Sequence, residues 1–445
     1  MEEKNIKINN ALTKQLLDFL IEDVNKNIVI SPLSVMNLLA MLADAASGET
    51  KEEIVSALGG ESDLQDIIAW LGDIQKELME SGALVASNAV CIREDLRDKV
   101  VPLYEERLKR TFGGRLFSAK DMVDAVNGWV SENTRGMITR IADDSWKSLI
   151  ACLMNAVAFD ARWAEKYEAE DLRFGEFYNS DGSYSEVMMM SSTEWQYIED
   201  PLFTGFVKPY REEGYSYMAL LPKKEGITYL KKAIKDLDLS RLYKSRSHEK
   251  VITTIPEYKF EFGEELNDFC RKLGISRAFS GEADFGTLIN ERLKVEKLIH
   301  KAYIQVDRNG TKAVAVSGFI ACYGAPPKID YKVVELDRPF LFAIVHNDTG
   351  LPVFVGTVNH LEDGEQEGEG FDLNVSSNEA GMDSFEIEAQ YARIQELISE
   401  AGTSVKVQRI KKEAELYYKN ENLDGLKFLE FHIKRRMGKE DEADE

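Results

Sequence analysis

The segment between residues 303 and 340 constrains the fold of this chain most. Strand-like alternation over 303–307 turns through Arg308-Asn309-Gly310 into small and apolar residues, with no charge between Lys312 and Lys328. No tight hairpin turn interrupts this stretch, so outside a sheet it would be a loop of about thirty residues. Loops of that length are usually functional or disordered, which makes the segment the first candidate for a functional site.

Alternation along residues 311–322 gives the segment two different faces if it forms a strand, because successive strand side chains point to opposite sides. The first face is small up to Phe319 and could slide over a packed layer. The second is rich in β-branched residues, which suit pairing within a sheet. The first face carries Thr311, Ala313, Ala315, Ser317, Phe319 and Ala321, and the second carries Lys312, Val314, Val316, Gly318, Ile320 and Cys322. An ordinary internal strand or a flexible linker is the alternative that this alternation leaves open.

Length and charge narrow the class of protein. The 445 residues include 44% hydrophobic and 30% charged residues, which is typical of a globular chain with one large domain or about three average ones. The net charge is −23 and no basic block is present, which argues against nucleic acid as a partner. No run of about 18 apolar residues occurs, so no membrane span is expected.

The start of the chain and its cysteines bear on the compartment. The first residues are polar and lack the apolar core of a secretory signal, so a cytoplasmic location is expected, or an extracellular one if a signal was removed. The four cysteines match no zinc or redox spacing. Cys91 and Cys152 lie in apolar runs and are predicted core residues. Cys322 lies in the long segment, where a free thiol fits a reducing compartment.

The order of helical and strand-like patterns predicts an α+β domain over residues 1–361, because helices come early and strands late. The composition then changes: residues 362–388 hold ten acids and no base. We therefore predict an acidic linker over 362–385. Helical patterning resumes in a small helical extension over 386–438, with a tail that binds a protein partner as the alternative. Residues 439–445 form an acidic tail.

Local signals predict one buried helix near the N-terminus. Ser31 is a predicted N-cap, followed by Pro32 as the first helical residue. The helix over 33–46 is apolar nearly all round, which is typical of a helix inside a large core. Residues 50–53 are predicted to form a capping box that opens the next helix. Much later, residues 347–350 form a predicted hairpin turn.

Catalytic and cofactor-binding motifs are missing from the sequence. None of the five histidines lies in a recognisable catalytic motif, and no nucleophile elbow or zinc-protease signature occurs. A phosphate-binding glycine loop is also lacking. We therefore expect neither an enzyme nor a metal site nor a bound cofactor.

Five motifs in a fixed order carry a family resemblance. They are residues 27–34 (NIVISPLS), 155–159 (NAVAF) with Trp163, 300–302 (HKA), 337–342 (DRPFLF) and 353–356 (VFVG). With these motifs the chain resembles the serpins, over roughly residues 11–361. Residues 27–34 are similar to the family's entry into its buried second helix, and residues 155–159 to the central strand of its main sheet.

The resemblance implies a fold and an activity. The fold is α+β, with N-terminal helices packed on a large mixed central sheet, smaller antiparallel sheets and an exposed reactive-centre loop. In serpins this loop is bait that a serine protease, or a cysteine protease, cleaves with formation of an acyl-enzyme. The freed loop then inserts into the main sheet as a new strand and traps the protease. We expect a monomer whose native fold is held kinetically above a more stable form.

The resemblance also assigns site residues. The reactive bond is expected at Gly324–Ala325, or one position earlier at Tyr323–Gly324, which suits elastase-, subtilisin- or chymotrypsin-like proteases. The loop hinge comprises Gly310, Thr311, Lys312, Ala313, Val314 and Ala315. The cluster expected to control sheet opening comprises Ser31, Ser34, Asn155, His300 and Trp163.

Two hinge residues depart from the family pattern. Inhibitory serpins usually have an acid two residues before the hinge glycine, where this chain has Arg308. They often have glutamate after the hinge threonine, where this chain has Lys312. A non-inhibitory serpin that binds a ligand or a partner is therefore the alternative to an inhibitor.

Overall fold

The computed structural model describes most of the chain. The described residues are 2–22, 26–59, 64–212, 214–311, 332–363 and 384–400, together with Ala414, Tyr418 and Leu426. The chain divides into two compact units, Met1–Gln366 and Glu367–Glu445, which are described separately. The boundaries predicted at residues 361, 385 and 438 stay predictions.

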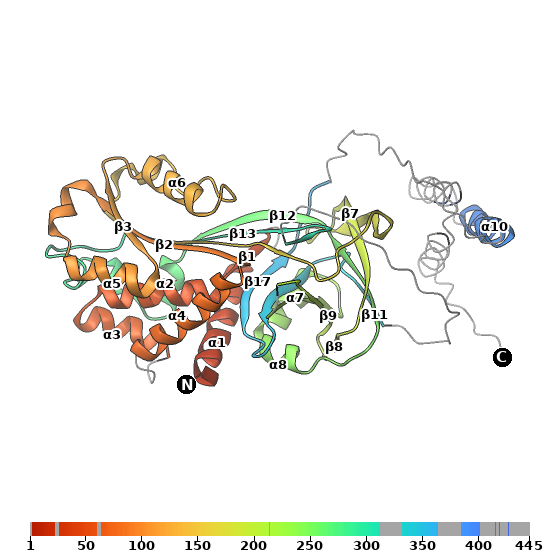
Figure 1. Cartoon of the computed structure of the whole chain (residues 1–445), viewed down its shortest axis with the longest axis horizontal. Helices are drawn as coiled ribbons and strands as arrows, with labels where there is room; N and C mark the ends of the chain where they lie inside the picture. Colours follow the sequence, from red (N-terminus) through yellow and green to blue (C-terminus); the bar gives the residue numbers. More distant parts are fainter. Residues whose placement is uncertain are drawn as a thin grey trace. The chain divides into compact units, whose positions relative to one another are not determined.

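Most α-helices of the first unit come before β4, and most of its strands come from β4 onward, as expected from the sequence (Figure 1). The α-helices are α1 (Glu2–Leu20), α2 (Pro32–Ala45), α3 (Gly48–Ala57), α4 (Leu64–Glu80), α5 (Pro102–Phe112), α6 (Met122–Asn133), α7 (Ile227–Lys235), α8 (Leu239–Lys244), α9 (Asn267–Lys272) and α10 (Ser384–Glu400). The strands are β1 (Ile28–Ile30), β2 (Leu84–Arg93), β3 (Arg115–Ala119), β4 (Ala151–Phe159), β5 (Ala161–Arg162), β6 (Leu172–Tyr178), β7 (Tyr184–Glu194), β8 (Tyr197–Glu199), β9 (Phe203–Pro209), β10 (Tyr215–Pro222), β11 (Val251–Pro256), β12 (Tyr258–Glu265), β13 (Lys297–Val306), β14 (Gly310–Thr311), β15 (Lys332–Glu335), β16 (Phe340–His346) and β17 (Pro352–Val358).

The central sheet is mixed, as expected. Among the described residues its strand order is β12-β13-β4-β2-β3. β13 is parallel to β4 and β2 is parallel to β3, whereas the other two pairs are antiparallel. β4 lies in the middle with every residue buried, which confirms the predicted central strand. We call the boundary between the parallel neighbours β4 and β13 the seam.

Two larger sheets and a two-stranded sheet, β14-β5, complete the first unit in its described part. A six-stranded sheet with the order β1-β17-β16-β10-β9-β8 is antiparallel throughout. Its β16–β17 hairpin confirms the predicted turn at residues 347–350. A four-stranded sheet with the order β15-β11-β7-β6 contains the strand in which the chain continues after the long segment, since β15 pairs in parallel with β11.

Helix α2 confirms the buried helix predicted from the sequence. Ser31 caps it with its hydroxyl, which accepts a hydrogen bond from the Ser34 N–H at 3.3 Å, and Pro32 begins the helix. All but one of its residues are buried, because α2 contacts both β4 of the central sheet and β17 of the six-stranded sheet. A helix enclosed in this way needs apolar residues on every side.

Helix α6 covers the opposite face of the central sheet from α2 (Figure 1). Its apolar residues form one buried cluster with both strands that border the seam. The members of this α6 cluster that matter below are Met122, Val126, Trp129 and Val130 of α6, Cys152, Met154, Ala156 and Ala158 of β4, and Ile299 and Tyr303 of β13. Cys91 and Cys152 are both buried in it, as predicted for small core residues.

The predicted capping box at residues 50–53 is wrong. Helix α3 begins earlier, at Gly48, so Thr50 lies inside its first turn. The Thr50 hydroxyl instead accepts a hydrogen bond from the Asp284 N–H at 3.0 Å. A partner more than two hundred residues away can take a hydroxyl that local spacing assigns to a cap.

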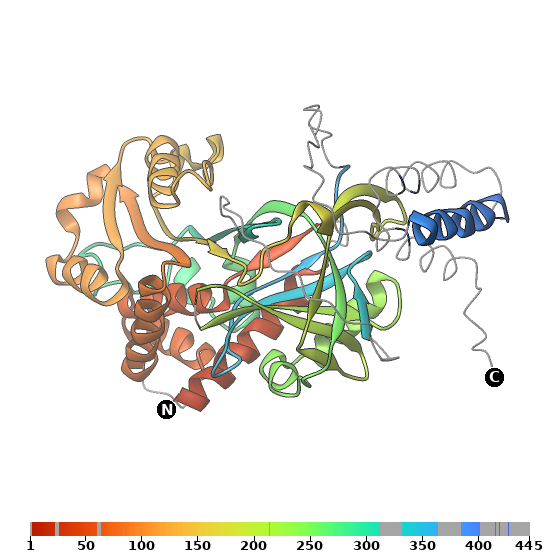
Figure 2. The same cartoon turned by 45° about the vertical axis from the view of Figure 1, so that its right-hand side comes forward.

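The second unit is described mainly through α10 (Figure 2). The side chains of Ile394, Leu397 and Ile398 are buried, and the rings of Tyr391 and Tyr418 stack 4.3 Å apart. Within the described parts of the chain, every helix is too short or too polar to span a membrane.

Truncating Phe159 should destabilise the first unit strongly. This ring at the end of β4 packs against Tyr210, Tyr215 and Phe354 at centroid distances of 5.0, 6.4 and 5.8 Å. Phe159→Ala should lower the free energy of unfolding by about 3–5 kcal/mol, because an aromatic side chain leaves a cavity in a packed core. Thermal unfolding followed by circular dichroism measures this loss. Leu103→Ala, at a mostly exposed side chain, is the control, and equal midpoints for the two variants would contradict the assignment.

Candidate functional site

A row of three buried polar residues crosses the seam in the middle of the central sheet. His300 of β13 lies opposite Asn155 of β4, and Asn155 lies opposite Asn88 of β2. All three side chains are buried. We call these residues the polar row. Polar side chains in a sheet core need mutual hydrogen bonds, because each unpaired buried group costs about 1–3 kcal/mol.

The hydrogen bonds of the polar row form one chain in which each residue donates to the next, from Ser31 to Phe112. The Ser31 N–H donates to His300 Nε2 at 3.1 Å, which leaves Nδ1 as the protonated nitrogen that faces Asn155 Oδ1 at 3.1 Å. Asn155 Nδ2 then donates to Asn88 Oδ1 at 2.8 Å, and Asn88 Nδ2 donates to the Phe112 carbonyl oxygen at 2.8 Å. This chain of bonds ties α2, β13, β4, β2 and the end of α5 together across the seam.

His300 is neutral in this arrangement. Complete burial lowers its pKa from 6.5 to about 3. A proton on Nε2 would remove the acceptor that the Ser31 N–H uses and would place a charge in the core. As a neutral ring, His300 accepts through Nε2 and donates through Nδ1 to Asn155 Oδ1.

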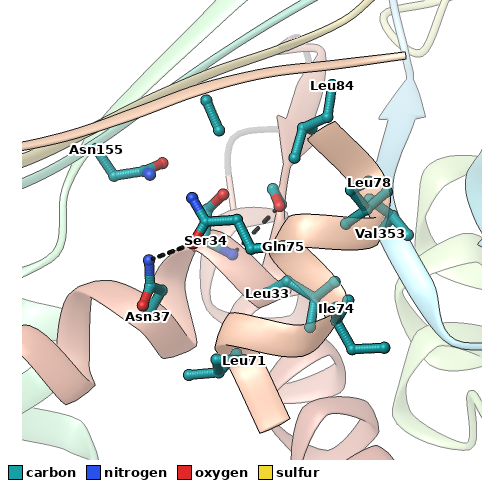
Figure 3. A pocket seen from close by; sticks show the side chains of 12 residues that line it. Leu33, Ser34, Asn37, Leu71, Ile74, Gln75, Leu78, Leu84, Asn155 and Val353 are labelled. Carbon is teal, nitrogen blue, oxygen red and sulfur yellow. Dashed lines mark hydrogen bonds between the residues drawn. The ribbon is translucent and has the colours of Figure 1, made fainter. Parts of the chain in front are cut away.

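A pocket lies beside Asn155 of the polar row, between α2, α4, β2 and β17 (Figure 3). Its empty space, including solvent at its mouth, is about 370 Å³. Its polar lining residues are Ser31, Ser34, Asn37, Gln75 and Asn155, and apolar side chains line the rest. The Asn155 side chain therefore borders open space on the α2 side of the sheet.

The base of the long segment, residues 307–311, is paired with β5 in a separate two-stranded sheet. The two residues of β14 pair antiparallel with β5, with Gly310 opposite Arg162 and Thr311 opposite Ala161. β5 follows β4 after a single residue. Gly310 approaches this strand so closely that a Cβ atom would lie 2.2 Å from the Ala161 carbonyl oxygen. The hinge position therefore requires glycine for steric reasons.

Trp163 also binds the base of the long segment through two hydrogen bonds. Its indole Nε1–H donates to the Asp307 carbonyl oxygen at 2.9 Å, and its backbone N–H donates to the Asn309 carbonyl oxygen at 3.0 Å. The ring is buried and stacks on Tyr210 with centroids 4.8 Å apart and planes 7° apart. The Tyr167 N–H adds a bond to the Arg308 carbonyl oxygen at 2.9 Å.

The departure at Arg308 occurs beside an acidic neighbour. Glu257, which precedes β12, accepts a hydrogen bond from the Arg308 backbone N–H at 3.3 Å. Burial raises the pKa of Glu257 above its usual value, and this N–H and the Arg308 charge oppose the rise. The positive charge of Arg308 thus lies close enough to Glu257 to favour its carboxylate form.

The structure brings together some of the predicted site residues and leaves others undescribed. Ser31, Asn155 and His300 join in one network, and Ser34 attaches to it through the Ser31 cap. Trp163 lies apart from them, at the loop base. The remaining predicted residues lie outside the described residues, namely Lys312, Ala313, Val314, Ala315, Tyr323, Gly324 and Ala325.

Sequence reasoning missed three residues of this region. Asn88 had a usable signal, because it is a polar residue within the apolar strand run of residues 84–93, as Asn155 is in its own strand. Glu257 and Tyr167 had none, since their roles depend on how distant segments meet the loop base. Among the described residues, no cluster of three or more His, Cys, Asp or Glu side chains is placed to hold a metal ion.

Comparison with known proteins points to one family. The family model for serpins (serine protease inhibitors) matches residues 7–361. The crystal structure of the thermophilic serpin tengpin in its native state superposes with a TM-score of 0.75 at 32% identity, covering 81% of this chain and 95% of tengpin. A serpin-like protein of Thermococcus kodakarensis is 28% identical over 76% of this chain and 82% of its own length. Intracellular coagulation inhibitor 2 of Tachypleus tridentatus is 26% identical over 76% of this chain and 86% of its own length.

The chain belongs to the serpin family. Membership supports a protease-inhibitor function in general and proteases as partners, since serpins generally inhibit proteases and do not catalyse reactions. The expected α+β serpin fold is confirmed.

Acidification should destabilise the protein through His300. The native state takes up this proton only below about pH 3, whereas the unfolded chain does so below about pH 6.5. The unfolded state therefore binds more protons between these values, and stability falls by up to about 1.4 kcal/mol per pH unit there. Unfolding midpoints from pH 7 to pH 4 should fall more steeply for the wild type than for His300→Gln. Parallel curves would contradict the neutral histidine.

An alanine at the hinge glycine should destabilise the native form. Gly310→Ala places a methyl group against the Ala161 carbonyl oxygen and should cost about 1–3 kcal/mol of unfolding free energy. Gly128→Ala is the matched control, because its Cβ meets nothing within 4 Å in helix α6 and should stabilise by up to about 1 kcal/mol. Thermal unfolding of both variants gives the comparison. A Gly310→Ala midpoint at or above that of the wild type would show that the close approach is absent.

Proposed function

We propose that the chain inhibits a serine protease, or secondarily a cysteine protease, as a suicide substrate. The protease cleaves the segment after Gly324, or after Tyr323, and forms an acyl-enzyme there. The freed segment then enters the seam between β4 and β13 as a new strand, and the attached protease is carried along and its active site distorted. One observation carries this proposal, namely the pairing of Gly310 and Thr311 with β5.

That pairing defines a register for the entering strand. Gly310 lies opposite Arg162 and Thr311 opposite Ala161, so each further residue of the segment meets one residue further back along β4. Continued without a bulge, the same register sets Ala315 opposite Val157 and Ser317 opposite Asn155. A hydroxyl would thus arrive at the polar row where His300 leaves Asn155, and it can donate to the vacated Asn155 Oδ1.

The register also decides which face of the new strand points to which layer. Opposed residues share a face, and Val157 and Phe159 of β4 point to the same side as α2. Ala313 and Ala315 would therefore enter on the crowded side, where small side chains are needed. Val314 and Val316 would enter opposite Ala158 and Ala156, under α6. Small residues of β4 face the larger residues of the segment there, which suits close packing.

Energetics favour insertion only after cleavage. A strand placed antiparallel to both β4 and β13 forms backbone hydrogen bonds on two sides, while the ladder that joins β4 to β13 is lost. The net gain is therefore about one ladder of hydrogen bonds, each worth about 0.5–1.5 kcal/mol net. The uncut segment is tethered at both ends, since it leaves β14 in one sheet and continues in β15, which pairs with β11 in another. Cleavage releases one tether. The uncut fold is then a kinetic trap and not the state of lowest free energy.

The residues near the reactive bond select the protease. Glycine and alanine at positions 324 and 325 suit the shallow specificity pockets of elastase- and subtilisin-like enzymes, and Tyr323 suits a chymotrypsin-like pocket. No basic residue lies between Lys312 and Lys328, so trypsin-like enzymes are not expected targets. The name of the relative intracellular coagulation inhibitor 2 favours inhibition over a role in ligand binding.

Incubation with elastase, subtilisin and chymotrypsin tests the proposal. A denaturing gel should show a covalent band, of the mass of inhibitor plus protease, with at least one of them and none with trypsin. Ala315→Arg should abolish the band and leave only cleaved product, because a buried arginine would block insertion. Lys328→Ala, beyond the reactive bond, is the control and should keep the band.

Cleaved product alone from the wild type with every enzyme would contradict inhibition. It would support the alternative, a non-inhibitory serpin that binds a ligand or a partner, for which Arg308 and Lys312 are the sequence grounds.

A further inference from the structure

We propose that the buried ion pair between Lys208 and Glu194 positions the base of the long segment for insertion. The inference rests on the proposed strand insertion and deepens it, because it names the residues that hold the first pairing of the segment in place. Lys208 lies on β9 of the six-stranded sheet, and Glu194 is the last residue of β7 in the four-stranded sheet. The Lys208 ammonium group donates to Glu194 Oε1 at 2.7 Å, so the pair joins these two sheets.

Both charges of the pair are almost completely removed from solvent. The side chain of Lys208 is 3% exposed and that of Glu194 is 9% exposed. Replacing such a pair by apolar side chains of similar volume is often neutral or stabilising, because two charges no longer have to leave water. Overall stability is thus a poor explanation for this pair, and the groups in contact with the two charges give a better one.

The Lys208 ammonium group contacts two aromatic rings. It lies 4.5 Å from the centroid of the Tyr167 ring and 5.6 Å from the centroid of the Trp163 ring. Both distances are within the range of a cation–π interaction, which is stronger when the cation is removed from water. An apolar side chain at position 208 could fill the space but could not supply this attraction. The charge of Lys208 therefore holds both rings at once.

The same two aromatic residues bind the base of the segment. Trp163 and Tyr167 together donate three hydrogen bonds to the backbone carbonyl oxygens of residues 307–309. The next residue along the chain is Gly310, which begins β14 and pairs with β5. Lys208 thus acts on this pairing through the two residues that place the backbone just before it.

Glu194 keeps the ammonium group in this position. Its Oε1 accepts from Lys208 and also from the Ser192 hydroxyl, at 2.7 Å in each case. The Ser192 hydroxyl in turn lies 3.0 Å from Thr253 Oγ1 of β11 and 3.4 Å from the Tyr167 hydroxyl. Without this carboxylate a lysine here would have to reach solvent or lose its charge. The four-stranded sheet therefore fixes the cation, and the cation fixes the rings.

The consequence for inhibition follows from where insertion begins. In the proposed mechanism the cut segment extends β14, while hydrolysis of the acyl-enzyme competes with this extension. A base held by fixed rings keeps Gly310 and Thr311 paired with β5, so the strand grows from a pairing that already exists. A base whose rings move spends part of its time unpaired, which slows insertion in proportion. The ion pair therefore favours trapping of the protease over release of cleaved inhibitor.

Replacing the pair by neutral residues of similar shape tests the proposal. The double variant Lys208→Met/Glu194→Gln leaves no lone buried charge. Hydrogen exchange of residues 161–167, followed by mass spectrometry, should become about two- to thirtyfold faster, the range that loss of a cation–π attraction gives. The ratio of cleaved to covalently trapped inhibitor on a denaturing gel should rise by a factor in the same range. Lys208→Arg, which keeps a cation against both rings, should stay near the wild type.

A second ion pair provides the matched control. Arg107 of α5 and Asp44 of α2 form a partly buried pair at 3.1 Å, and Figure 1 shows α5 away from β7 and β9. Arg107→Met/Asp44→Asn should change neither the exchange of residues 161–167 nor the ratio of cleaved to trapped inhibitor.

The two measurements separate this inference from insertion itself. Absence of a covalent complex in the wild type contradicts the proposed function and with it the role in insertion, whereas hydrogen exchange still shows whether the pair holds the base. Wild-type behaviour of the double variant in both measurements overturns the inference. Equally faster exchange throughout the first unit also overturns it, because that indicates a general loss of stability. So does faster exchange of residues 161–167 with an unchanged ratio, because the base then does not limit insertion.

A single variant replaces the double variant if the latter does not fold. Lys208→Gln removes the cation, while its amide can still donate a hydrogen bond to Glu194. The same rise in exchange and in the ratio is required of it, and wild-type values for both would overturn the inference.

Discussion

The parallel pairing of β4 with β13 is the constraint on which the rest of this molecule depends. Because β4 and β13 run in the same direction, one new strand between them could pair antiparallel with both. Backbone pairing over seven opposed residue pairs holds the seam, and the polar row adds one histidine–asparagine side-chain hydrogen bond, supported by the Ser31 N–H. This side-chain bond is specific in geometry, and its net contribution is about 0.5–1.5 kcal/mol.

Features on both faces of the central sheet contact the strands that border the seam. Beneath it, a pocket lies beside Ser34 and Asn155 (Figure 3). Above it, α6 packs on β4 and β13 together and is anchored at its end by Arg135. At its upper end, Trp163 and Gly310 already hold the first residues of the segment against β5. Strand entry would therefore extend an existing pairing and would need no new nucleus, whose formation is normally the costly step.

Several elements of the fold could be predicted from the sequence because they depend on local patterns. The apolar helix after Ser31 and the turn at 347–350 have chemical signals within a few residues, and both are confirmed. The predicted capping box at 50–53 failed because Thr50 bonds to a residue far along the chain. Glu257 was missed for the same reason, since local spacing cannot reveal which distant segment meets a given side chain. The face of small residues along the segment was visible in the sequence. The register proposed for that segment against β4 rests on the pairing of Gly310 with Arg162, which the sequence does not show.

In the proposed mechanism the uncut chain is stored above a more stable form that contains one more strand. The thermal unfolding midpoint before and after a single cut within residues 319–327 tests this claim most directly. A large rise on cleavage is predicted, because the freed segment adds a fully hydrogen-bonded strand to the centre of the sheet. An unchanged midpoint, with the cut segment still open to further proteolysis, would contradict it.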